Sequence, residues 1–461
     1  MKASITVSQN IYSGDNRMDA SFYTSSGIQT KNQLEQWSRK ANRKTDRLSE
    51  LADLFNGPRF PRFYVNEIER SIPFLSSSDM LQADLSDVKR LSLKRTPKSL
   101  LESIKIERGW TLISCSGTIG NCVYVRPDMD AMKGSQHIMR VVPKSQIPSG
   151  YLFTFLSSSM GYNLLTQGTF GAVIQHIEPY HIKDIPVPRL DLAVEKHIHT
   201  LVEQASTLRT QANVLLEQAK NEIEQHVGFR KPRHSFDHAY SLGTASIDSN
   251  FGMRLDAFGY IGYVEDALKT LDKYTGKVMS AQEVGYEFFN PPIFKRMFAD
   301  SGHPYMSAVN FYNLHPLPER YLSRLQPDVD QYLIRKGMVL VQNAGQRYGL
   351  ITKPLFVTET LDGIAVTSDV VRISHTDPIE NGYICGLLST NFGRRLALRY
   401  SYGTSIPRLD VPKFSLIKIP YPEDNFRRRI GKFVVDAYQQ REQANVLEDQ
   451  AQVALSNALH T

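Results

Sequence analysis

The chain is poor in several features, and each shortage excludes a class of protein. Three cysteines among 461 residues (Cys115, Cys122 and Cys385) exclude a disulfide framework, and no cysteine–histidine set has the spacing of a zinc site. No apolar run approaches the roughly eighteen residues that cross a bilayer. No Walker-type phosphate loop occurs, so ATP chemistry would have to lie in another chain. We therefore expect a protein of the reducing cytoplasm that contacts no membrane.

Charge is nearly balanced, with 54 Lys and Arg against 47 Asp and Glu and a net charge of +7. Hydrophobic residues make up 41% and charged residues 22%, which is ordinary for a folded protein and excludes wholesale disorder. The small positive excess is compatible with a polyanionic partner but does not require one. Composition alone therefore leaves the function open.

An internal duplication is the most informative feature of the sequence. Residues 211–219 read QANVLLEQA and residues 443–451 read QANVLEDQA, an offset of 232. Further matches follow in the same order at similar offsets: Arg17–Ala20 with Arg254–Ala257, Asn56–Phe60 with Asn290–Phe294, GWTLISCSGTIG (109–120) with GMVLVQNAGQRYG (337–349), Gly150–Leu152 with Gly382–Ile384, Gly161 with Gly393, Gly171 and Ile174 with Gly403 and Ile406, and IPVP (185–188) with IPYP (419–422). A repeat unit of this length predicts a duplicated domain rather than a solenoid.

Each half ends in a segment with the pattern of a long helix. Apolar residues recur in alternating steps of four and three, which is the seam of a coiled coil. The seam positions are Val194, Ile198, Leu201, Ala205, Leu208, Ala212, Leu215 and Ala219 in the first half, and Phe426, Ile430, Phe433, Ala437, Ala444, Leu447 and Ala451 in the second, with polar Gln440 among them. A narrow stripe of this length needs a partner helix, and we predict that the two copies pair antiparallel. The alternative, that each helix packs only on its own domain, stays open.

The globular parts have the pattern of a mixed α/β fold. Short β-rich runs (WTLISC, NCVYV, MVLVQ, DVVRIS) alternate with turn signals, and helices are expected at 33–55, 151–166 and 383–399. The predicted architecture is internally duplicated, with two α+β domains separated by an antiparallel two-helix coiled coil. The expected boundaries are 1–190 for the first domain, 191–227 for the first spacer helix, 228–250 for a linker, 251–422 for the second domain and 423–461 for the second spacer helix.

This layout resembles the specificity subunit of a type I restriction-modification system. The resemblance rests on the duplication, on a glycine turn after a β-strand in each half (SGTIG and NAGQRYG), and on the path from GYL through G-x-x-I to I-P-x-P and the heptad helix. It covers nearly the whole chain. The sequence departs from the commoner pattern of that family in two places, its basic front segment, 31–47, and its long linker, 228–250.

The resemblance implies that each globular part is a target recognition domain that reads one half of a split sequence in double-stranded DNA. The paired helices would act as a spacer and as a dock for two modification subunits, which methylate adenine with S-adenosylmethionine. Restriction subunits that cleave DNA with ATP and magnesium would join in some complexes. The chain itself would then be no enzyme and would hold no cofactor and no metal. Because the loops of the two halves differ in sequence, we expect an asymmetric target.

Three pairs of loops contain the candidate DNA-contacting residues. Glycine turns let a backbone approach DNA closely, basic residues beside aromatic rings suit a phosphate contact, and amide and guanidinium groups can read base edges. The candidates are Ser116, Thr118, Gln346, Arg347 and Tyr348 in the glycine turns, Arg59, Phe60, Arg62, Lys295 and Arg296 in loops 57–63 and 291–297, and Gln167, Thr169, Gln175, Tyr402, Thr404, Ser405 and Arg408 in the segments 166–175 and 400–408. Ordinary hairpin turns and solvated loops are the alternatives.

Two other functions fit parts of the sequence. Asn290-Pro291-Pro292-Ile293 is similar to the Asn-Pro-Pro-aromatic motif of DNA adenine methyltransferases, but Ile293 cannot stack a flipped base, so we interpret the segment as a loop. A coiled-coil adaptor that binds no DNA is the second alternative.

The histidines of 176–199 lack carboxylates at ligand spacing, so no metal is expected there. The run Arg427–Arg429 is expected to be a solvated face.

Overall fold

The computed structural model describes residues 25–40, 43–65, 70–130, 132–167, 176–230, 262–347 and 349–460. The chain divides into two compact units, unit 1 with Met1–Thr210 and Gln443–Thr461, and unit 2 with Gln211–Glu442. Two long helices, α9 (Leu192–His226) and α14 (Asp424–His460), each contribute one part to each unit. Among the described helices, none combines the length and apolar character needed to cross a membrane.

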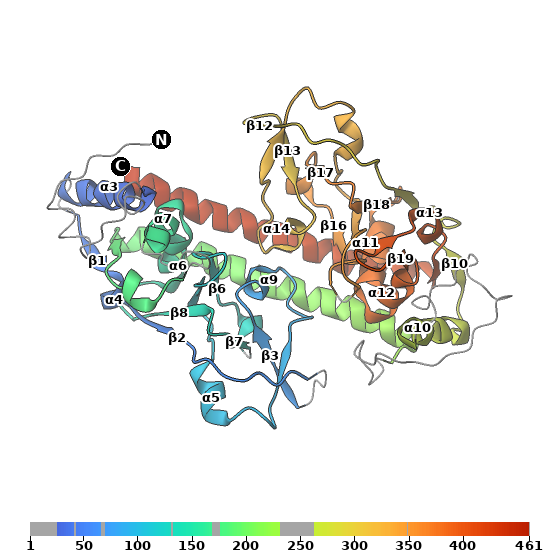
Figure 1. Ribbon diagram of the computed structural model, residues 1–461, viewed down its shortest axis with the longest axis horizontal. Helices are drawn as coiled ribbons and strands as arrows, with labels where there is room; N and C mark the ends of the chain where they lie inside the picture. Colours follow the sequence, from blue (N-terminus) through green and yellow to red (C-terminus); the bar gives the residue numbers. More distant parts are fainter. Residues whose placement is uncertain are drawn as a thin grey trace. The chain divides into compact units, whose positions relative to one another are not determined.

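Unit 1 contains two small sheets with helices packed on them (Figure 1). The larger sheet is antiparallel, in the order β2 (Ala52–Asn56), β8 (Ile138–Pro143), β5 (Thr111–Ser114) and β6 (Cys122–Tyr124). The smaller sheet has the order β4 (Arg90–Ser92), β3 (Ser71–Leu75) and β7 (Lys133–Gly134), and β1 (Thr45–Arg47) pairs with β9 (Pro186–Pro188). Its helices besides the long pair are α3 (Ser26–Lys40), α4 (Leu48–Leu51), α5 (Lys98–Ser103), α6 (Ser149–Ser157), α7 (Ser159–Gln167) and α8 (Pro179–Ile182).

Unit 2 repeats the topology of the larger sheet strand by strand and has additional strands elsewhere. Its larger sheet has the order β11 (Glu287–Phe289), β18 (Val370–Ser374), β15 (Val339–Gln342) and β16 (Pro354–Phe356). The smaller sheet has the order β12 (Phe298–Ala299), β14 (Arg320–Leu322), β13 (His303–Met306) and β17 (Ala365–Val366), and two further pairs are β10 (Val278–Ser280) with β21 (Lys418–Pro420) and β19 (Ser401–Tyr402) with β20 (Arg408–Leu409). Its helices are α10 (Gly262–Lys273), α11 (Pro378–Ser389), α12 (Asn391–Leu398) and α13 (Val411–Phe414). The predicted mixed, internally duplicated α/β fold is confirmed.

The central strands explain where each core lies. Strands β5 and β15 carry the runs TLIS and VLVQ, and every residue of both is buried. A strand without polar alternation is typical of a sheet that is covered on both faces. In unit 1, α6 packs on β5, and in unit 2, α11 packs on β15. The parts of α9 and α14 that belong to each unit complete the same cores.

The matched glycines are fixed by close packing between helices. A Cβ atom on Gly161 would lie 2.1 Å from the carbonyl oxygen of Phe155, and one on Gly393 would lie 2.0 Å from that of Leu387. These distances are far inside van der Waals contact, so no larger residue fits without a shift of the backbone. Both glycines therefore allow the sharp break between two consecutive helices, α6 and α7 in one unit and α11 and α12 in the other.

Each unit also buries an arginine on its second sheet strand. Arg140 on β8 and Arg372 on β18 are almost fully buried, and both donate hydrogen bonds to backbone carbonyl oxygens. Burial lowers the pKa of each guanidinium to about 10. These bonds replace the hydrogen bonds to water that each guanidinium loses on burial. They also connect β8 with the segment around Ile104, and β18 with Tyr332.

Side-chain contacts between α9 and α14 are antiparallel within each unit. In unit 1, Arg209 Nη2 donates to Asn445 Oδ1 at 2.7 Å, and in unit 2, Arg441 Nη2 donates to Asn213 Oδ1 at 2.7 Å. Both bonds come from the repeated sequence Arg-x-Gln-Ala-Asn, so each copy supplies the arginine once and the asparagine once. The seam alanines are buried: Ala205, Ala212, Ala219, Ala437, Ala444 and Ala451. The predicted antiparallel helix pair is confirmed in each unit.

Four expectations about local structure are wrong in whole or in part. The segment 33–55 is not one helix, because its second part forms β1 and β2, whose pairing with β9 and β8 overrides helix propensity. The helices expected at 151–166 and 383–399 are each broken in two, at Ser158 and at Thr390, whose hydroxyl oxygens accept the N–H groups of the following turn. Of the run Arg427–Arg429, Arg428 and Arg429 are exposed as expected, but Arg427 is 8% exposed and bonds Glu380.

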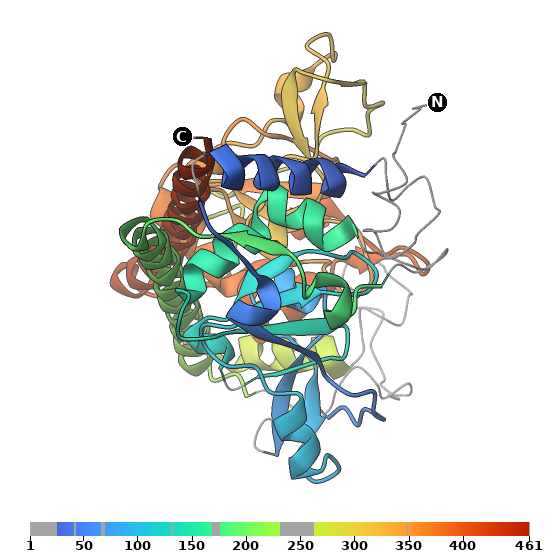
Figure 2. The same ribbon diagram turned by 90° about the vertical axis from the view of Figure 1, so that its left-hand side faces the viewer.

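Helix α3 packs inside unit 1 and is part of its fold. Figures 1 and 2 show it beside the last turns of α14 and beside α7. Leu34 and Trp37 on α3 are buried. The basic front segment that distinguishes this sequence is thus partly a packed helix.

Candidate nucleic-acid interface

The same backbone pattern follows the central strand of each sheet. In unit 1, Cys115 N–H donates to the carbonyl oxygen of His137, and an isolated bridge pairs Ser116 with His176. In unit 2, Asn343 N–H donates to the carbonyl oxygen of Asp369, and an isolated bridge pairs Ala344 with Arg408. Three positions therefore correspond between the units: 116 with 344, 137 with 369 and 176 with 408.

A directed chain of hydrogen bonds crosses this place in unit 1. Arg62 Nη2 donates to Oε1 of Gln136, which leaves the amide nitrogen of Gln136 to donate to His137 Nε2 at 2.8 Å. The remaining proton of a neutral imidazole then lies on Nδ1, which donates to Ser116 Oγ at 2.8 Å. Burial lowers the pKa of His137, and the positive charges of Arg62, His176 and Arg59 lower it further. We call Arg62, Gln136, His137 and Ser116 the unit 1 relay.

Other predicted residues of unit 1 lie around or away from this relay. Arg59 is exposed, and Phe60 packs edge-on against Phe74 with ring centroids 5.9 Å apart. Thr118 is exposed in the glycine turn, where its carbonyl oxygen accepts Ser114 Oγ. Gln167 lies at the end of α7 against Gly27 of α3. Thr169 and Gln175 lie outside the described residues.

In unit 2 the glycine turn and the segment 400–408 form one surface. Arg347 donates to the carbonyl oxygen of Gly403 at 2.8 Å, and Gln346 Nε2 donates to that of Ser405 at 3.3 Å. The exposed residues of this surface include Tyr402, Thr404 and Ser405. Two loops that are far apart in the sequence are thus joined, as a shared binding surface requires. Tyr348 lies outside the described residues.

Arg408 stands in unit 2 where His176 stands in unit 1. Its Nη1 donates to Asp369 Oδ1 at 2.7 Å, and both side chains are more than a third exposed. The ion pair holds the guanidinium in place while leaving it accessible to a ligand. Equivalent positions therefore present histidines in one unit, one of them in the relay, and an arginine–carboxylate pair in the other.

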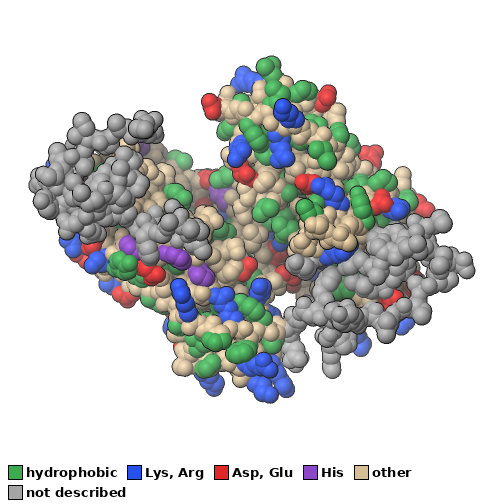
Figure 3. All heavy atoms as spheres, viewed as in Figure 1, with side chains coloured by type: hydrophobic (Ala, Val, Ile, Leu, Met, Phe, Trp, Pro, Cys, Tyr) green, Lys and Arg blue, Asp and Glu red, His purple; other side chains and the backbone are tan. Residues whose placement is uncertain are grey.

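The loops 57–63 and 291–297 connect the larger to the smaller sheet of their units. Lys295 and Arg296 are exposed, and Arg296 Nη1 donates to the hydroxyl of Tyr305 at 3.0 Å. Phe294 stacks on Tyr332 with ring centroids 3.6 Å apart. Figure 3 shows Lys and Arg side chains gathered over α5 and β3 in unit 1, and over the β12–β13 tip of unit 2. Both small sheets thus carry exposed basic groups, which suits contact with phosphates.

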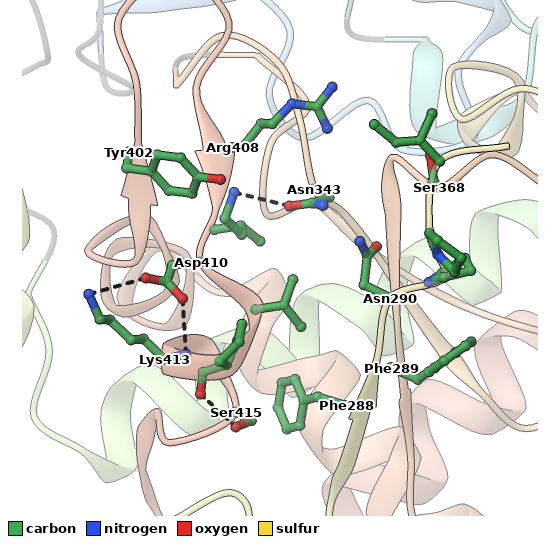
Figure 4. A pocket seen from close by; sticks show the side chains of 16 residues that line it. Phe288, Phe289, Asn290, Asn343, Ser368, Tyr402, Arg408, Asp410, Lys413 and Ser415 are labelled. Atoms are coloured by element: carbon green, nitrogen blue, oxygen red, sulfur yellow. Dashed lines mark hydrogen bonds and ion pairs between the residues drawn. The ribbon is translucent and has the colours of Figure 1, made fainter.

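Unit 2 also contains an open cavity of about 1060 Å³. It is lined by Tyr402 and Arg408 and by the whole Asn290–Ile293 segment, together with Phe288, Phe289, Asn343, Ser368, Leu409, Asp410, Val411, Pro412, Lys413 and Ser415 (Figure 4). The segment that resembles a methyltransferase motif is a loop, as interpreted, and it forms one wall of this cavity. Within the described residues, no three His, Cys, Asp or Glu side chains gather as a metal site would require.

Sequence reasoning missed Gln136, His137 and Asp369. They lie just before β8 and β18, in segments without periodicity, and long-range strand pairing brings them beside the glycine turns. A signal was present, because His137 and Asp369 stand at the offset of 232 that relates the two halves, three residues before the matched Arg140 and Arg372.

No family model and no curated protein matches the chain. Several solved structures do match it. A type I restriction-modification system S subunit from M. genitalium is 13% identical over 90% of this chain and 94% of its own, with a TM-score of 0.37. The chain is similar to type I restriction-modification S subunits.

Two further matches belong to the same system. An HsdS subunit from Thermoanaerobacter tengcongensis is 15% identical over 90% of this chain and 96% of its own, with a TM-score of 0.28. A chain from a study of complex assembly and conformational transition in the type I restriction-modification system is 15% identical over 90% of this chain and 97% of its own, also with a TM-score of 0.28.

Proposed function

We propose that the chain is the DNA-specificity subunit of a type I restriction-modification complex, with one target recognition domain in each unit. It reads a bipartite, asymmetric sequence in double-stranded DNA and leaves catalysis to partner subunits. One observation carries the proposal: two units of the same topology place different side chains at the same positions of a surface lined by glycine turns. A duplicated scaffold with diverged polar positions is what two different half-sites require.

The equivalent positions offer different groups to a base edge. In unit 1 the relay ends at Ser116, whose hydroxyl hydrogen is left to donate to an acceptor on a base. In unit 2, Asp369 orients the guanidinium of Arg408, and such a planar fork suits the O6 and N7 acceptors of guanine. Exposed basic residues in the loops between the two sheets, Arg59 and Lys295 among them, would contact phosphates and supply affinity that is independent of sequence.

The antiparallel helix pair would hold the two recognition domains apart as a spacer and would provide the surface on which the modification subunits bind. Arg209 with Asn445, and Arg441 with Asn213, fix the antiparallel register in each unit. Each repeat copy would offer an equivalent helix surface, so two modification subunits would dock. S-adenosylmethionine would be bound by those subunits, and ATP and magnesium by restriction subunits where these are present.

Paired substitutions test the assignment of one half-site to each unit. Asp369→Asn with Arg408→Gln removes both charges of the ion pair, so neither is left unpaired. We expect the base preference of one half-site to change, by about 1–3 kcal/mol of discrimination at the affected base pair. The measurement is the motif methylated in cells that carry the complex with each variant.

His137→Asn with His176→Gln is the matched variant in unit 1. It should alter only the other half-site, because it removes the equivalent groups of the other unit. A change of both half-sites by either variant would contradict the assignment.

A further inference from the structure

The end of α9 supplies a carboxylate and an aromatic ring to the start of α12 in unit 2. Glu224 Oε1 accepts the N–H of Asn391 at 2.7 Å and that of Phe392 at 3.4 Å, the first two residues of α12. A carboxylate at this place satisfies N–H groups that have no partner within the helix, and it faces the positive end of the helix dipole. Phe229, three residues beyond α9, is buried with its ring centroid 5.6 Å from that of Phe392.

The equivalent residues of unit 1 supply neither group. The offset of 232 places Ser456 where Glu224 stands in unit 2, and it places Thr461 where unit 2 has the aromatic ring. It also places Ser159 and Met160, the first two residues of α7, where α12 begins. Among the described residues, no side-chain oxygen accepts the N–H of Ser159 or Met160. The start of α7 therefore lacks the carboxylate that caps α12.

A cavity of about 910 Å³ lies at this place in unit 1, and Figure 2 shows α3 and the end of α14 beside it. Ser159, Met160 and Ser456 all line the cavity, and both serines are exposed. Leu34 and Trp37 of α3 form part of an apolar wall. A ligand in the cavity can therefore meet the start of α7 and apolar side chains at the same time.

The charge of the lining favours an acidic occupant. Among the described residues that line the cavity there is no Asp or Glu, whereas Arg43 is one of them. The guanidinium of Arg43 lies 5.1 Å from the ring centroid of Trp37 and makes no ion pair with a described residue. In unit 2 this position is Gly276, because the next residues, Lys44 and Lys277, accept equivalent backbone hydrogen bonds. Unit 1 thus has a cation and no carboxylate where unit 2 has the reverse.

We propose that this cavity is a docking site for a segment of a partner protein that carries a glutamate or aspartate beside an aromatic residue. The carboxylate accepts the N–H groups of Ser159 and Met160 and pairs with Arg43, and the ring packs on the apolar wall. Because unit 2 fills the equivalent place itself, each chain has one such site. The site goes beyond DNA recognition, since none of its lining residues is among the candidate DNA contacts.

The test is a fluorescence titration of the full chain with the peptide acetyl-Ser-Glu-Phe-Gly-Ser-amide. Trp37 reports on the cavity, and Trp110→Phe removes the second of the two tryptophans. We expect saturable binding that is weakened about tenfold or more when glutamine replaces the glutamate of the peptide, because the charge-assisted hydrogen bonds are lost. Alanine in place of the phenylalanine should weaken binding as well.

Two substitutions in the chain test the assignment from the protein side. Ser456→Glu supplies the carboxylate within the chain, so it should prevent binding of the peptide and raise the midpoint of thermal unfolding. Gln450→Glu is the matched control, since it adds the same charge at an exposed position of α14 outside the cavity and should change neither result. Ser159→Pro, which suits the first position of a helix but removes an N–H, should weaken binding, whereas Ser159→Ala keeps the N–H and should not.

No binding of the peptide by the wild type would overturn the proposal, including the case in which another segment of the same chain occupies the cavity. Equal binding of the glutamate and glutamine peptides, or binding that survives Ser456→Glu, would also contradict it. Displacement of the peptide by duplex DNA of random sequence would assign the cavity to phosphate and overturn the docking of a protein. None of these results bears on the methylation motif of the complex, so this proposal and the proposed function fail separately.

Discussion

His137 and Asp369 occupy the same position in the two units, yet one is a ring held neutral in a relay and the other is the anion of an ion pair. The pKa of His137 lies below its ordinary value, first because of burial and then because of Arg62, His176 and Arg59. A protonated ring would present an N–H to the amide nitrogen of Gln136, so the relay requires the neutral form. The hydrogen-bonding character of this surface thus depends on its cationic neighbours.

Replacing Arg62 by methionine tests this electrostatic account. Without the guanidinium charge, the pKa of His137 should rise toward 6.5, although part of the depression should remain because burial is its largest cause. An NMR titration of the histidine ring signals measures the change. Arg39→Met, on the exposed face of α3, is the control and should leave the titration unaltered. If Arg62→Met also left it unaltered, the relay would not be set by charge.

At the scale of elements, the duplication made much of the fold predictable. The matched glycines recur because each copy makes the same tight contacts. The tyrosines of the matched GYL and GYI segments also make equivalent bonds: Tyr151 donates to the carbonyl oxygen of Pro188, at the end of β9, and Tyr383 donates to that of Pro420, at the end of β21. The helix expected at 33–55 failed because the pairing of β2 with β8 is set by residues far along the chain. His137 and Asp369 could not be predicted for the same reason, because long-range strand pairing places them at the surface. Ser116 and Arg408 could be predicted, because each lies close to a glycine turn in the sequence.

The caps of α11 and α12 give a prediction with an internal control. Asp377 caps α11 by accepting the N–H of Ile379, and this bond, with Arg428, keeps the pKa of Asp377 below its ordinary 3.8. Asp377→Ala should therefore cost about 1 kcal/mol of unfolding free energy. That contribution is complete above pH 3.8 and is lost as the pH falls through the lower folded-state value.

Thr390, which caps α12 through the N–H of Gly393, carries no charge. Thr390→Ala should therefore lower the free energy of unfolding by a similar amount at every pH. Urea unfolding of both variants and of the wild type, at neutral and at acidic pH, measures the two losses. Equal pH dependence of the two losses would show that the Asp377 cap owes nothing to its ionisation.

For the whole molecule, the proposed specificity role requires that the helix pair sets the gap between half-sites. Helix α9 passes from unit 1 to unit 2 between Thr210 and Gln211. Helix α14 passes from unit 2 to unit 1 between Glu442 and Gln443. Inserting four residues at both places leaves the bonds of Arg209 and Arg441 inside their units and lengthens each helix by roughly 6 Å. We expect the unspecified gap of the methylated motif to widen by about two base pairs while both half-sites stay the same.

Insertion into only one helix is the control, because it shifts the seam of one helix against the other and should abolish methylation instead of moving it. Changed half-sites with an unchanged gap would show that the helices are not the spacer.

The central claim is tested most directly by single-molecule sequencing of adenine methylation in cells that carry this gene with its neighbouring methyltransferase gene, compared with deletion of this gene alone. The account predicts one asymmetric, gapped motif whose methylation disappears on deletion, which would give both half-sites at once. An unchanged methylome would contradict the specificity role and would favour a coiled-coil adaptor that binds no DNA.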